Sequence, residues 1–227
     1  MGSSENVFRI GLAAPGTRMP PELARRAQAL ADKAYHGRVE LRFHPQCFRQ
    51  AGHFAGDDQE RIDALVEIAN DPAIDAVWLA RGGYGACRVA EFAIPQLNAA
   101  ARAKPWLGYS DAGFLLAGLC KAGFRDVAHG PMPVDLVRED GEEALMRGLA
   151  WLVERDQRAL EPSLAPGQKA RLRAVGMTEP LEGVVRLVEP VIDATTRLGR
   201  ARITVEAEGL RPGMFVEAEI LVAEREG

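Results

Sequence analysis

The spacing of apolar residues changes near residue 160, and a different kind of structure is predicted on each side. Before that point, short apolar runs alternate with stretches in which apolar residues recur at helical spacing. After about residue 169 the chain has no good helical window. Apolar and polar residues alternate there with period two, which is typical of half-buried antiparallel strands. Residues 162–167 are the natural linker.

The first part is predicted to alternate strands and helices. The expected strands cover residues 8–13, 39–43, 74–80, 106–109 and 127–128. The expected helices cover residues 20–35, 57–70, a stretch after 85 that breaks near Pro95, 112–121 and 139–155. The strand at 74–80 is almost wholly apolar, which favours burial on both faces, as in a parallel sheet. This order indicates an α/β fold, an open parallel sheet with flanking helices.

The second part is predicted to be all strand. The expected strands cover residues 170–175, 183–189, 201–207 and 214–222, with a turn at 210–213 between the last two. We expect a small antiparallel β-barrel-like domain. The predicted domains are therefore residues 1–165 and 166–227.

Composition and charge exclude several classes of function. The net charge of −4 gives no basic footprint for nucleic acid. No apolar run is long enough to span a bilayer, and the N-terminus lacks the pattern of a secretory signal, so we expect a cytoplasmic protein with no membrane partner. Cys47, Cys87 and Cys120 show no metal spacing, and we interpret each as a buried or semi-buried apolar residue. We expect no metal and no cofactor.

The first candidate for chemistry is Ser110, which falls between a predicted buried strand and a helix. At such a corner a hydroxyl projects above the sheet edge, as in a nucleophile elbow. The N–H of Asp111, at the start of the helix, would point toward an oxyanion formed there. The alternative is that Ser110 only caps the helix through its side chain, and spacing alone favours that alternative.

The second candidate is the glycine-rich run at residues 81–85, which also follows a buried strand. Ligands bind at this end of the strands in open α/β sheets, and glycine lets a backbone amide approach a reacting oxygen closely. The alternative is a tight turn with no ligand. Arg81 is either a bidentate donor to a substrate carboxylate or a structural ion-pair partner, and the residues do not decide between the two.

Four motifs, GHFAGDDQER, WLARGGYGACR, WLGYSD and AHGPM, resemble in order and spacing the LD-carboxypeptidase family over residues 8–168. The family includes muramoyltetrapeptide carboxypeptidases and microcin-C immunity peptidases. The resemblance implies a flavodoxin-like N-terminal domain and a serine hydrolase with a Ser-Glu-His triad. Its substrate would be the murein tetrapeptide or a similar small peptide, cleaved between an L-centre and a terminal D-residue. It also implies that Ser110 is the nucleophile and that the amides of Gly83 and Asp111 form the oxyanion hole.

Residues 166–224 resemble a different family, the β-barrel domain of the periplasmic adaptor proteins of efflux pumps. The resemblance is carried by Pro190, Asp193, Thr196-Arg197 and the LRPGM run at 210–214. The join falls near residues 166–169, and the chain has the character of a chimera.

The second resemblance has a chemical consequence, because the carboxypeptidase family takes its triad Glu and His from a C-terminal domain. The four histidines here are His36, His44, His53 and His129. Without a base a serine hydroxyl is a poor nucleophile, so we expect weak or absent turnover. His129 as a replacement base is a remote alternative. Two others are a non-catalytic chimeric fold and a binding module that keeps the carboxypeptidase cleft.

An α/β part of this family normally buries surface against its C-terminal partner domain. Without that domain an apolar patch should remain exposed. We therefore expect self-association, with a homodimer as its simplest form, or marginal solubility.

Overall fold

The computed structural model describes residues 7–160, 167–174, 179–188, 201–206 and 214–220. The chain divides into two compact units, Met1–Leu160 and Glu161–Gly227. Each unit is described by itself.

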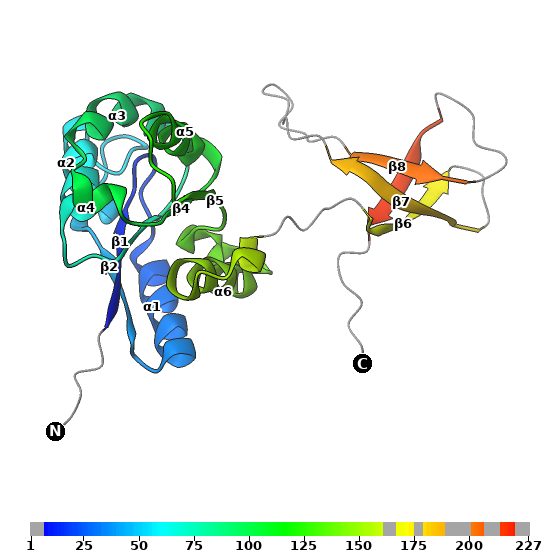
Figure 1. The fold of residues 1–227 in the computed structure, drawn as a ribbon, viewed down its shortest axis with the longest axis horizontal. Coiled ribbons are helices and arrows are strands. Elements are labelled where there is room, and N and C mark those ends of the chain that lie inside the picture. Colours follow the sequence, from blue (N-terminus) through cyan, green and yellow to red (C-terminus); the bar gives the residue numbers. More distant parts are fainter. Residues whose placement is uncertain (1–6, 161–166, 175–178, 189–200, 207–213, 221–227) are drawn as a thin grey trace. The chain divides into compact units, whose positions relative to one another are not determined.

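The first unit is an open α/β sheet, as predicted. Its five strands are all parallel and lie in the order β2-β1-β3-β4-β5 (Figure 1). The strands are β1 (Phe8–Ala13), β2 (Val39–Phe43), β3 (Ala76–Leu79), β4 (Trp106–Gly108) and β5 (Val127–His129). The helices are α1 (Pro21–Tyr35), α2 (Asp58–Asn70), α3 (Ala86–Ala93), α4 (Ala99–Arg102), α5 (Gly113–Lys121) and α6 (Gly141–Leu149). This strand order is the flavodoxin-like one.

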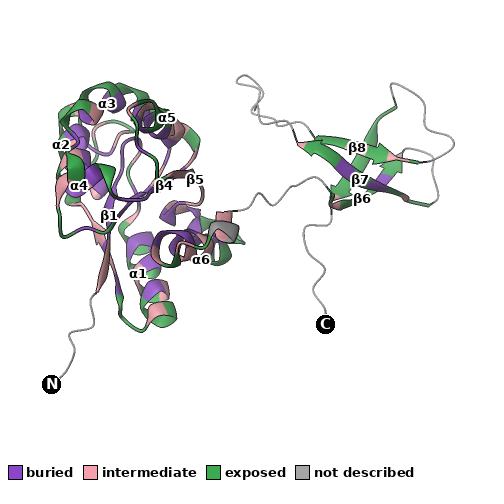
Figure 2. Ribbon diagram, viewed as in Figure 1, coloured by how far each residue is buried: buried purple, intermediate pink, exposed green. Residues whose placement is uncertain are grey.

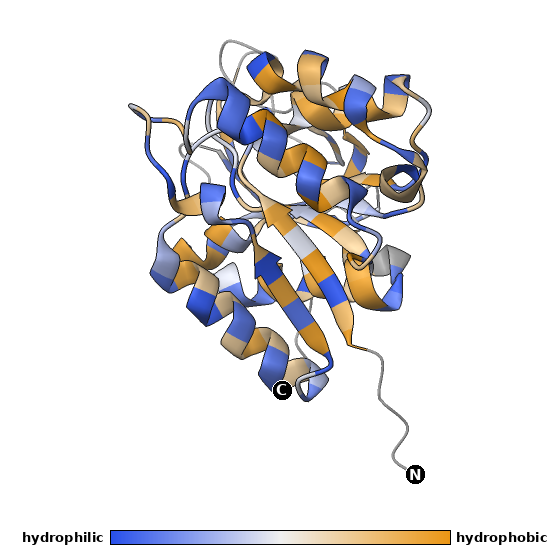
Figure 3. Ribbon diagram, turned by 90° about the vertical axis from the view of Figure 1, so that its left-hand side faces the viewer, coloured by the Kyte–Doolittle hydropathy of each residue, from blue (hydrophilic) through white to orange (hydrophobic). Residues whose placement is uncertain are grey.

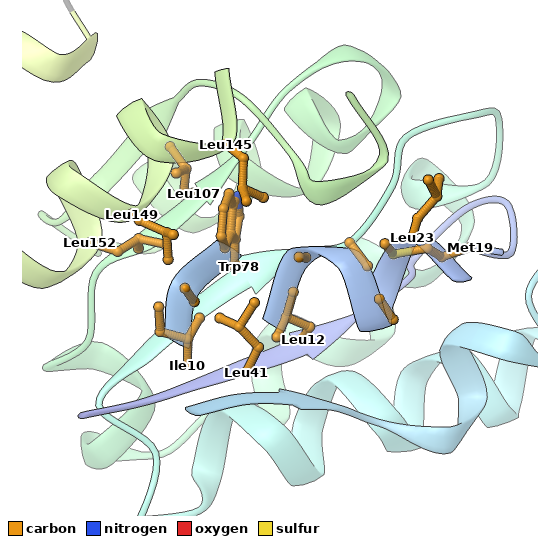
Figure 4. Close-up of a cluster of buried hydrophobic side chains, with 14 of the residues drawn as sticks. Ile10, Leu12, Met19, Leu23, Leu41, Trp78, Leu107, Leu145, Leu149 and Leu152 are labelled. Carbon is orange, nitrogen blue, oxygen red and sulfur yellow. The ribbon is translucent and has the colours of Figure 1, made fainter. Parts of the chain in front are cut away.

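Helices cover both faces of this sheet, and the central strand β3 shows why. Its four residues are all buried, and successive side chains point to opposite faces. Trp78 joins the core cluster beneath α1 and α6, which Figure 4 shows in close-up. Val77 and Leu79 join the second cluster, beneath α2, α3 and α5. A strand buried on both faces has no polar side to show, which explains its unbroken apolar sequence.

Helices α1, α3 and α6 combine buried apolar residues with exposed charged ones, and hydrophobic and hydrophilic residues alternate along several helices in Figure 3. Helix α2 begins with a full capping box. The Asp57 side chain accepts from the Glu60 N–H, and the Glu60 side chain accepts from the Asp57 N–H. The helix therefore begins where the sequence indicates, and it ends at Asn70, just before Asp71-Pro72, as residues preceding a proline disfavour helical geometry.

Several boundaries differ from those predicted. The long helix expected at 139–155 is α6 followed by a π-helix, Ala150–Glu154, which Arg155 closes in a left-handed conformation. A 3-10 helix, Ser110–Ala112, precedes α5, so the helix expected from residue 112 starts one residue later. The break near Pro95 is confirmed, because α3 passes into the 3-10 turn Ile94–Gln96.

The second unit contains a four-stranded antiparallel sheet in the order β8-β7-β6-β9, the half-barrel expected from the period-two pattern. The strands are β6 (Lys169–Ala174), β7 (Leu181–Val188), β8 (Ala201–Val205) and β9 (Val216–Ile220). Among the described residues of this unit, buried ones are few and lie on the two central strands, as Figure 2 shows for β7. They include Ala170, Leu172 and Val185.

β8 and β9 lie at opposite edges of this sheet, and the turn predicted between them at 210–213 falls outside the described residues. The expected half-burial fails on β9, where Val216 and Ala218 are exposed. An edge strand has a neighbour on one side only, which leaves its side chains less covered than those of a central strand.

Candidate functional site

Three loops of the first unit leave the carboxyl ends of neighbouring strands and meet at one edge of the sheet. They are residues 14–17 after β1, 80–85 after β3 and 109–112 after β4. This edge is where open α/β sheets place their ligands. These loops carry Ser110, Asp111, Gly83 and Arg81, whereas the alternative base His129 lies at the end of β5.

Ser110 stands at the corner between β4 and α5. Its φ is 61°, one of three positive values among the described non-glycine residues, and its side chain is exposed. A Cβ placed on Gly82 would lie 3.0 Å from Ser110 Cβ and 3.2 Å from its Oγ, so the hydroxyl lies beside the glycine turn. Neither the 3-10 helix nor α5 has a side-chain cap, so the capping alternative is not what the described structure adopts.

Tyr109 anchors this corner from the other side. Its hydroxyl donates to Asp135 Oδ1 at 2.5 Å, and Asp135 Oδ2 accepts from the Met132 N–H at 2.8 Å. Asp135 is buried, and burial together with this hydrogen bond raises the pKa of the Tyr109 phenol. The residue before Ser110 is therefore fixed, which helps to hold a positive φ that would otherwise relax.

The glycine turn is packed against the loop after β1. The Thr17 N–H donates to the Gly82 carbonyl at 3.1 Å. The Gly82 carbonyl and the Gly83 N–H belong to the same trans peptide, in which the C=O and the N–H point in opposite directions. Because the carbonyl faces Thr17, the Gly83 N–H faces away from it. A Cβ on Gly16 would lie 2.1 Å from the Gly83 oxygen, which leaves room only for glycine there.

A buried arginine, Arg61 on α2, hydrogen-bonds to both the loop after β1 and the glycine turn after β3. Its Nη1 donates to the Gly85 carbonyl at 3.0 Å and to the Pro15 carbonyl, and its Nη2 pairs with Asp58. Its guanidinium also lies over the Phe54 ring, 4.5 Å from the centroid. Sequence reasoning gave Arg61 no role. The available signal was a charged residue at helical spacing with Leu65 and Ile68 on the core face.

The two predicted oxyanion donors are the N–H groups of Gly83 and Asp111. Within the described part of the chain neither N–H has a hydrogen-bond partner. The Asp111 carboxylate, which sequence reasoning left unassigned, accepts from the Ala86 N–H at 2.7 Å. Arg81 Nη1 donates to the Arg18 carbonyl at 2.9 Å, and among the described residues Arg81 has no carboxylate partner, which disfavours the ion-pair alternative.

No described histidine is hydrogen-bonded to the Ser110 hydroxyl. His129, paired with Gly108 in the β4–β5 register, is nearest along the sheet, and its ring packs edge-on against Tyr109. Partial burial lowers the pKa of His129. His44 caps a 3-10 turn and approaches Glu67, and His53 stacks on Phe54 with ring centroids 3.8 Å apart.

The three cysteines differ in exposure. Cys47 is fully buried, and burial raises the pKa of its thiol to about 12. Cys87 and Cys120 are exposed, contrary to the expectation that they would be buried or semi-buried.

The described residues contain no group of His, Cys, Asp and Glu that could hold a metal ion. None of their helices is long and apolar enough to cross a bilayer.

Two family profiles match the chain. The LD-carboxypeptidase N-terminal domain matches residues 10–130, and the CusB-like β-barrel domain matches residues 150–224. The murein tetrapeptide carboxypeptidase of Pseudomonas aeruginosa is 30% identical over 132 residues, which are 56% of this chain and 40% of that protein. The chain spans between 28% and 40% of the length of the curated relatives it matches.

Solved structures show the same fold. The muramoyltetrapeptide carboxypeptidase from Oxalobacter formigenes superposes with a TM-score of 0.53 at 22% identity, covering 78% of this chain and 54% of that one. An MccF-like protein from Bacillus anthracis gives a TM-score of 0.53 at 22% identity, covering 65% and 45%. The first profile accounts for more than half of the 227 residues. The chain therefore belongs to the LD-carboxypeptidase family through its N-terminal domain, and a CusB-like β-barrel domain follows that domain in the sequence.

Proposed function

We propose that the α/β unit is a serine hydrolase domain of the LD-carboxypeptidase type, acting on a murein tetrapeptide or a related small peptide. Ser110 is the nucleophile, and the N–H groups of Gly83 and Asp111 stabilise the oxyanion. The observation that carries the proposal is the exposed Ser110 hydroxyl, held at a strained strand-to-helix corner beside the Gly82 turn. Membership of the family supports the same assignment.

In the proposed reaction Ser110 Oγ attacks the carbonyl carbon of the scissile amide. The new O–C bond forms while the carbonyl electrons move onto the oxygen, where the two N–H groups face the developing charge. The C–N bond then breaks, the amine takes up a proton, and water hydrolyses the ester. The first step needs a base to accept the hydroxyl proton.

We propose that turnover of the 227-residue chain is low, because no described histidine reaches Ser110. An oxyanion hole and substrate binding alone leave roughly 10³–10⁴-fold acceleration over water when a triad member is lost. Arg81 is proposed to contact the substrate carboxylate, since among the described residues its guanidinium is hydrogen-bonded only to the Arg18 carbonyl, which leaves donors for a carboxylate.

The proposal is tested by the release of the terminal D-residue from the tetrapeptide. We expect slow release by the wild-type chain and none by Ser110→Ala. Added imidazole, which titrates in the same range as histidine, should raise the wild-type rate by about tenfold, less than a positioned base supplies. It should leave Ser110→Ala unchanged. Equal rates for the two chains with imidazole present would rule out Ser110 as the nucleophile.

A second candidate function, a binding module, is favoured because no described histidine is hydrogen-bonded to Ser110. In that case the tetrapeptide should raise the melting temperature of wild type and Ser110→Ala alike, with no release in either. In both proposals the β unit does no chemistry, and its junction with the carboxypeptidase domain makes the chain a chimera of two families.

A further inference from the structure

The Asp111 side chain joins two parts of the proposed site that are far apart in sequence. Its Oδ2 accepts from the N–H of Ala86, 25 residues away, at 2.7 Å. Ala86 is the first residue of α3, and the N-cap position before it is Gly85, which has no side chain with which to cap the helix. A carboxylate from another loop therefore satisfies an N–H that the helix leaves open.

The turn that carries Gly83 is held at three points. On the β1 side the Thr17 N–H binds the Gly82 carbonyl, and from below Arg61 binds the Gly85 carbonyl at 3.0 Å. On the side of the nucleophile, Asp111 Oδ2 accepts from the Ala86 N–H. Without this hydrogen bond the turn would be freer to shift relative to the Ser110 corner.

The placement of the negative charge also matters. A carboxylate aimed at the oxyanion would oppose the charge that develops in the transition state. Asp111 instead directs Oδ2 to the first N–H of α3, where the helix dipole favours an anion. Its backbone N–H stays open to the corner, so one residue supplies an oxyanion donor and restrains the turn that supplies the other.

We propose that the Asp111 carboxylate is a positioning residue that fixes the Gly83 N–H relative to Ser110. This inference rests on the proposed function. It concerns geometry rather than charge, so the side chain must present an acceptor at the Ala86 N–H and need not be ionised. Asn keeps that acceptor without the charge, whereas Glu keeps the charge but displaces the acceptor by one methylene.

The test measures how fast Ser110 is labelled by a fluorophosphonate, followed by mass spectrometry of the intact chain with imidazole present. The Oγ–P bond forms as the P–F bond breaks, fluoride leaves, and the hydroxyl proton passes to imidazole. The phosphoryl oxygen occupies the place of the oxyanion. We expect Asp111→Ala and Asp111→Glu to slow labelling by at least tenfold, toward the ~100-fold that a misplacement of about 1 Å can cost. Asp111→Asn should be labelled at close to the wild-type rate.

Asn98→Ala is the matched control, because Asn98 caps α4 through a bond to the Ala101 N–H at 3.1 Å, away from the corner. It should lower the melting temperature as a lost cap does and leave labelling unchanged. If Asp111→Ala does not fold, Asp111→Glu against Asp111→Asn carries the test.

The outcomes separate the two proposals. A wild-type chain that is not labelled at Ser110 overturns the proposed function and this inference with it. A labelled wild type with Asp111→Ala and Asp111→Glu equally fast overturns the inference alone. Slow labelling of Asp111→Asn with fast labelling of Asp111→Glu also overturns it, since charge would then be the property that matters.

Discussion

At the scale of single residues, the backbone conformation that exposes Ser110 at the corner lowers the stability of the folded chain. A left-handed conformation costs a residue with a Cβ roughly 1–2 kcal/mol. Ser110 adopts it with φ 61°, while its neighbour Tyr109 is tied to the buried Asp135. Strain that the surrounding structure maintains, at a residue with an exposed hydroxyl, is typical of a functional site.

This strain can be measured by substitution. Glycine adopts positive φ without the Cβ penalty, so Ser110→Gly should raise the free energy of unfolding by about 0.5–1 kcal/mol, the gain being reduced by the greater freedom of glycine in the unfolded chain. Ser110→Ala keeps the Cβ and should bring no such gain. Urea denaturation of the three chains compares them. If the Gly and Ala variants are equally stable, the corner is not strained.

The site residues that could be predicted from the sequence are those that belong to a local pattern. Ser110 and the glycine run each follow a buried strand, so topology alone brings them to one sheet edge. The contacts that restrain them were out of reach, because they join distant segments: Asp111 with Ala86, and Thr17 with Gly82. No spacing in the sequence encodes which carboxylate turns toward which N–H.

At the scale of elements, α2 supports the site through one buried charge. Arg61 is 0% exposed, and its guanidinium donates to the loops after β1 and β3. Arg61→Met keeps most of the volume but leaves the Gly85 and Pro15 carbonyls without this donor. We expect the free energy of unfolding to fall by about 2–4 kcal/mol, as when one partner of a buried polar network is removed.

The control for Arg61→Met is Arg49→Met. Arg49 pairs with Glu60 on the surface, and an exposed pair contributes about 0–1 kcal/mol. Urea denaturation gives both values. Similar small losses in the two variants would mean that the loops hold their positions without the buried guanidinium.

Element type followed from hydrophobic period more reliably than element boundaries did. Strand β3 and the capped helix α2 were predicted because burial on two faces and a capping box leave direct traces in the sequence. The π-helix at Ala150–Glu154 leaves no such trace, since its residues continue the apolar pattern of α6. The exposure of β9 depends on its place at the sheet edge, which period two does not reveal.

At the scale of the whole molecule, the α/β unit leaves large apolar side chains in contact with solvent. Phe92 on α3 is 59% exposed and Phe114 on α5 is 63% exposed. Exposed apolar groups of this size favour association, so we predict a homodimer formed through the α/β unit. The double variant Phe92→Ser, Phe114→Ser should contain more monomer than the wild-type chain. Light scattering after size exclusion measures the two molar masses.

Phe215 in the second unit provides the control, because it is 93% exposed. Phe215→Ser should leave the dimer unchanged if the α/β unit carries the contact. A shift to monomer with Phe215→Ser alone would assign the association to the β unit, and a monomeric wild type would remove the prediction.

The α/β unit should fold without the β unit, because both core clusters draw only on residues between 8 and 160. We predict that the melting temperature of a chain of residues 1–160 lies within roughly 2–4 °C of that of the α/β unit in the 227-residue chain. A shift of that size corresponds to about 1 kcal/mol for a domain of this size. Truncation at residue 149 should unfold it, since that removes the buried Trp151 and Leu152, which pack in the first cluster. Circular dichroism and calorimetry of the chains 1–227, 1–160 and 1–149 measure whether each is folded and at what temperature it melts. A 1–160 chain that is unfolded while 1–227 is folded would show that the carboxypeptidase half depends on the β unit, and the two families would then have to be treated as one folding unit.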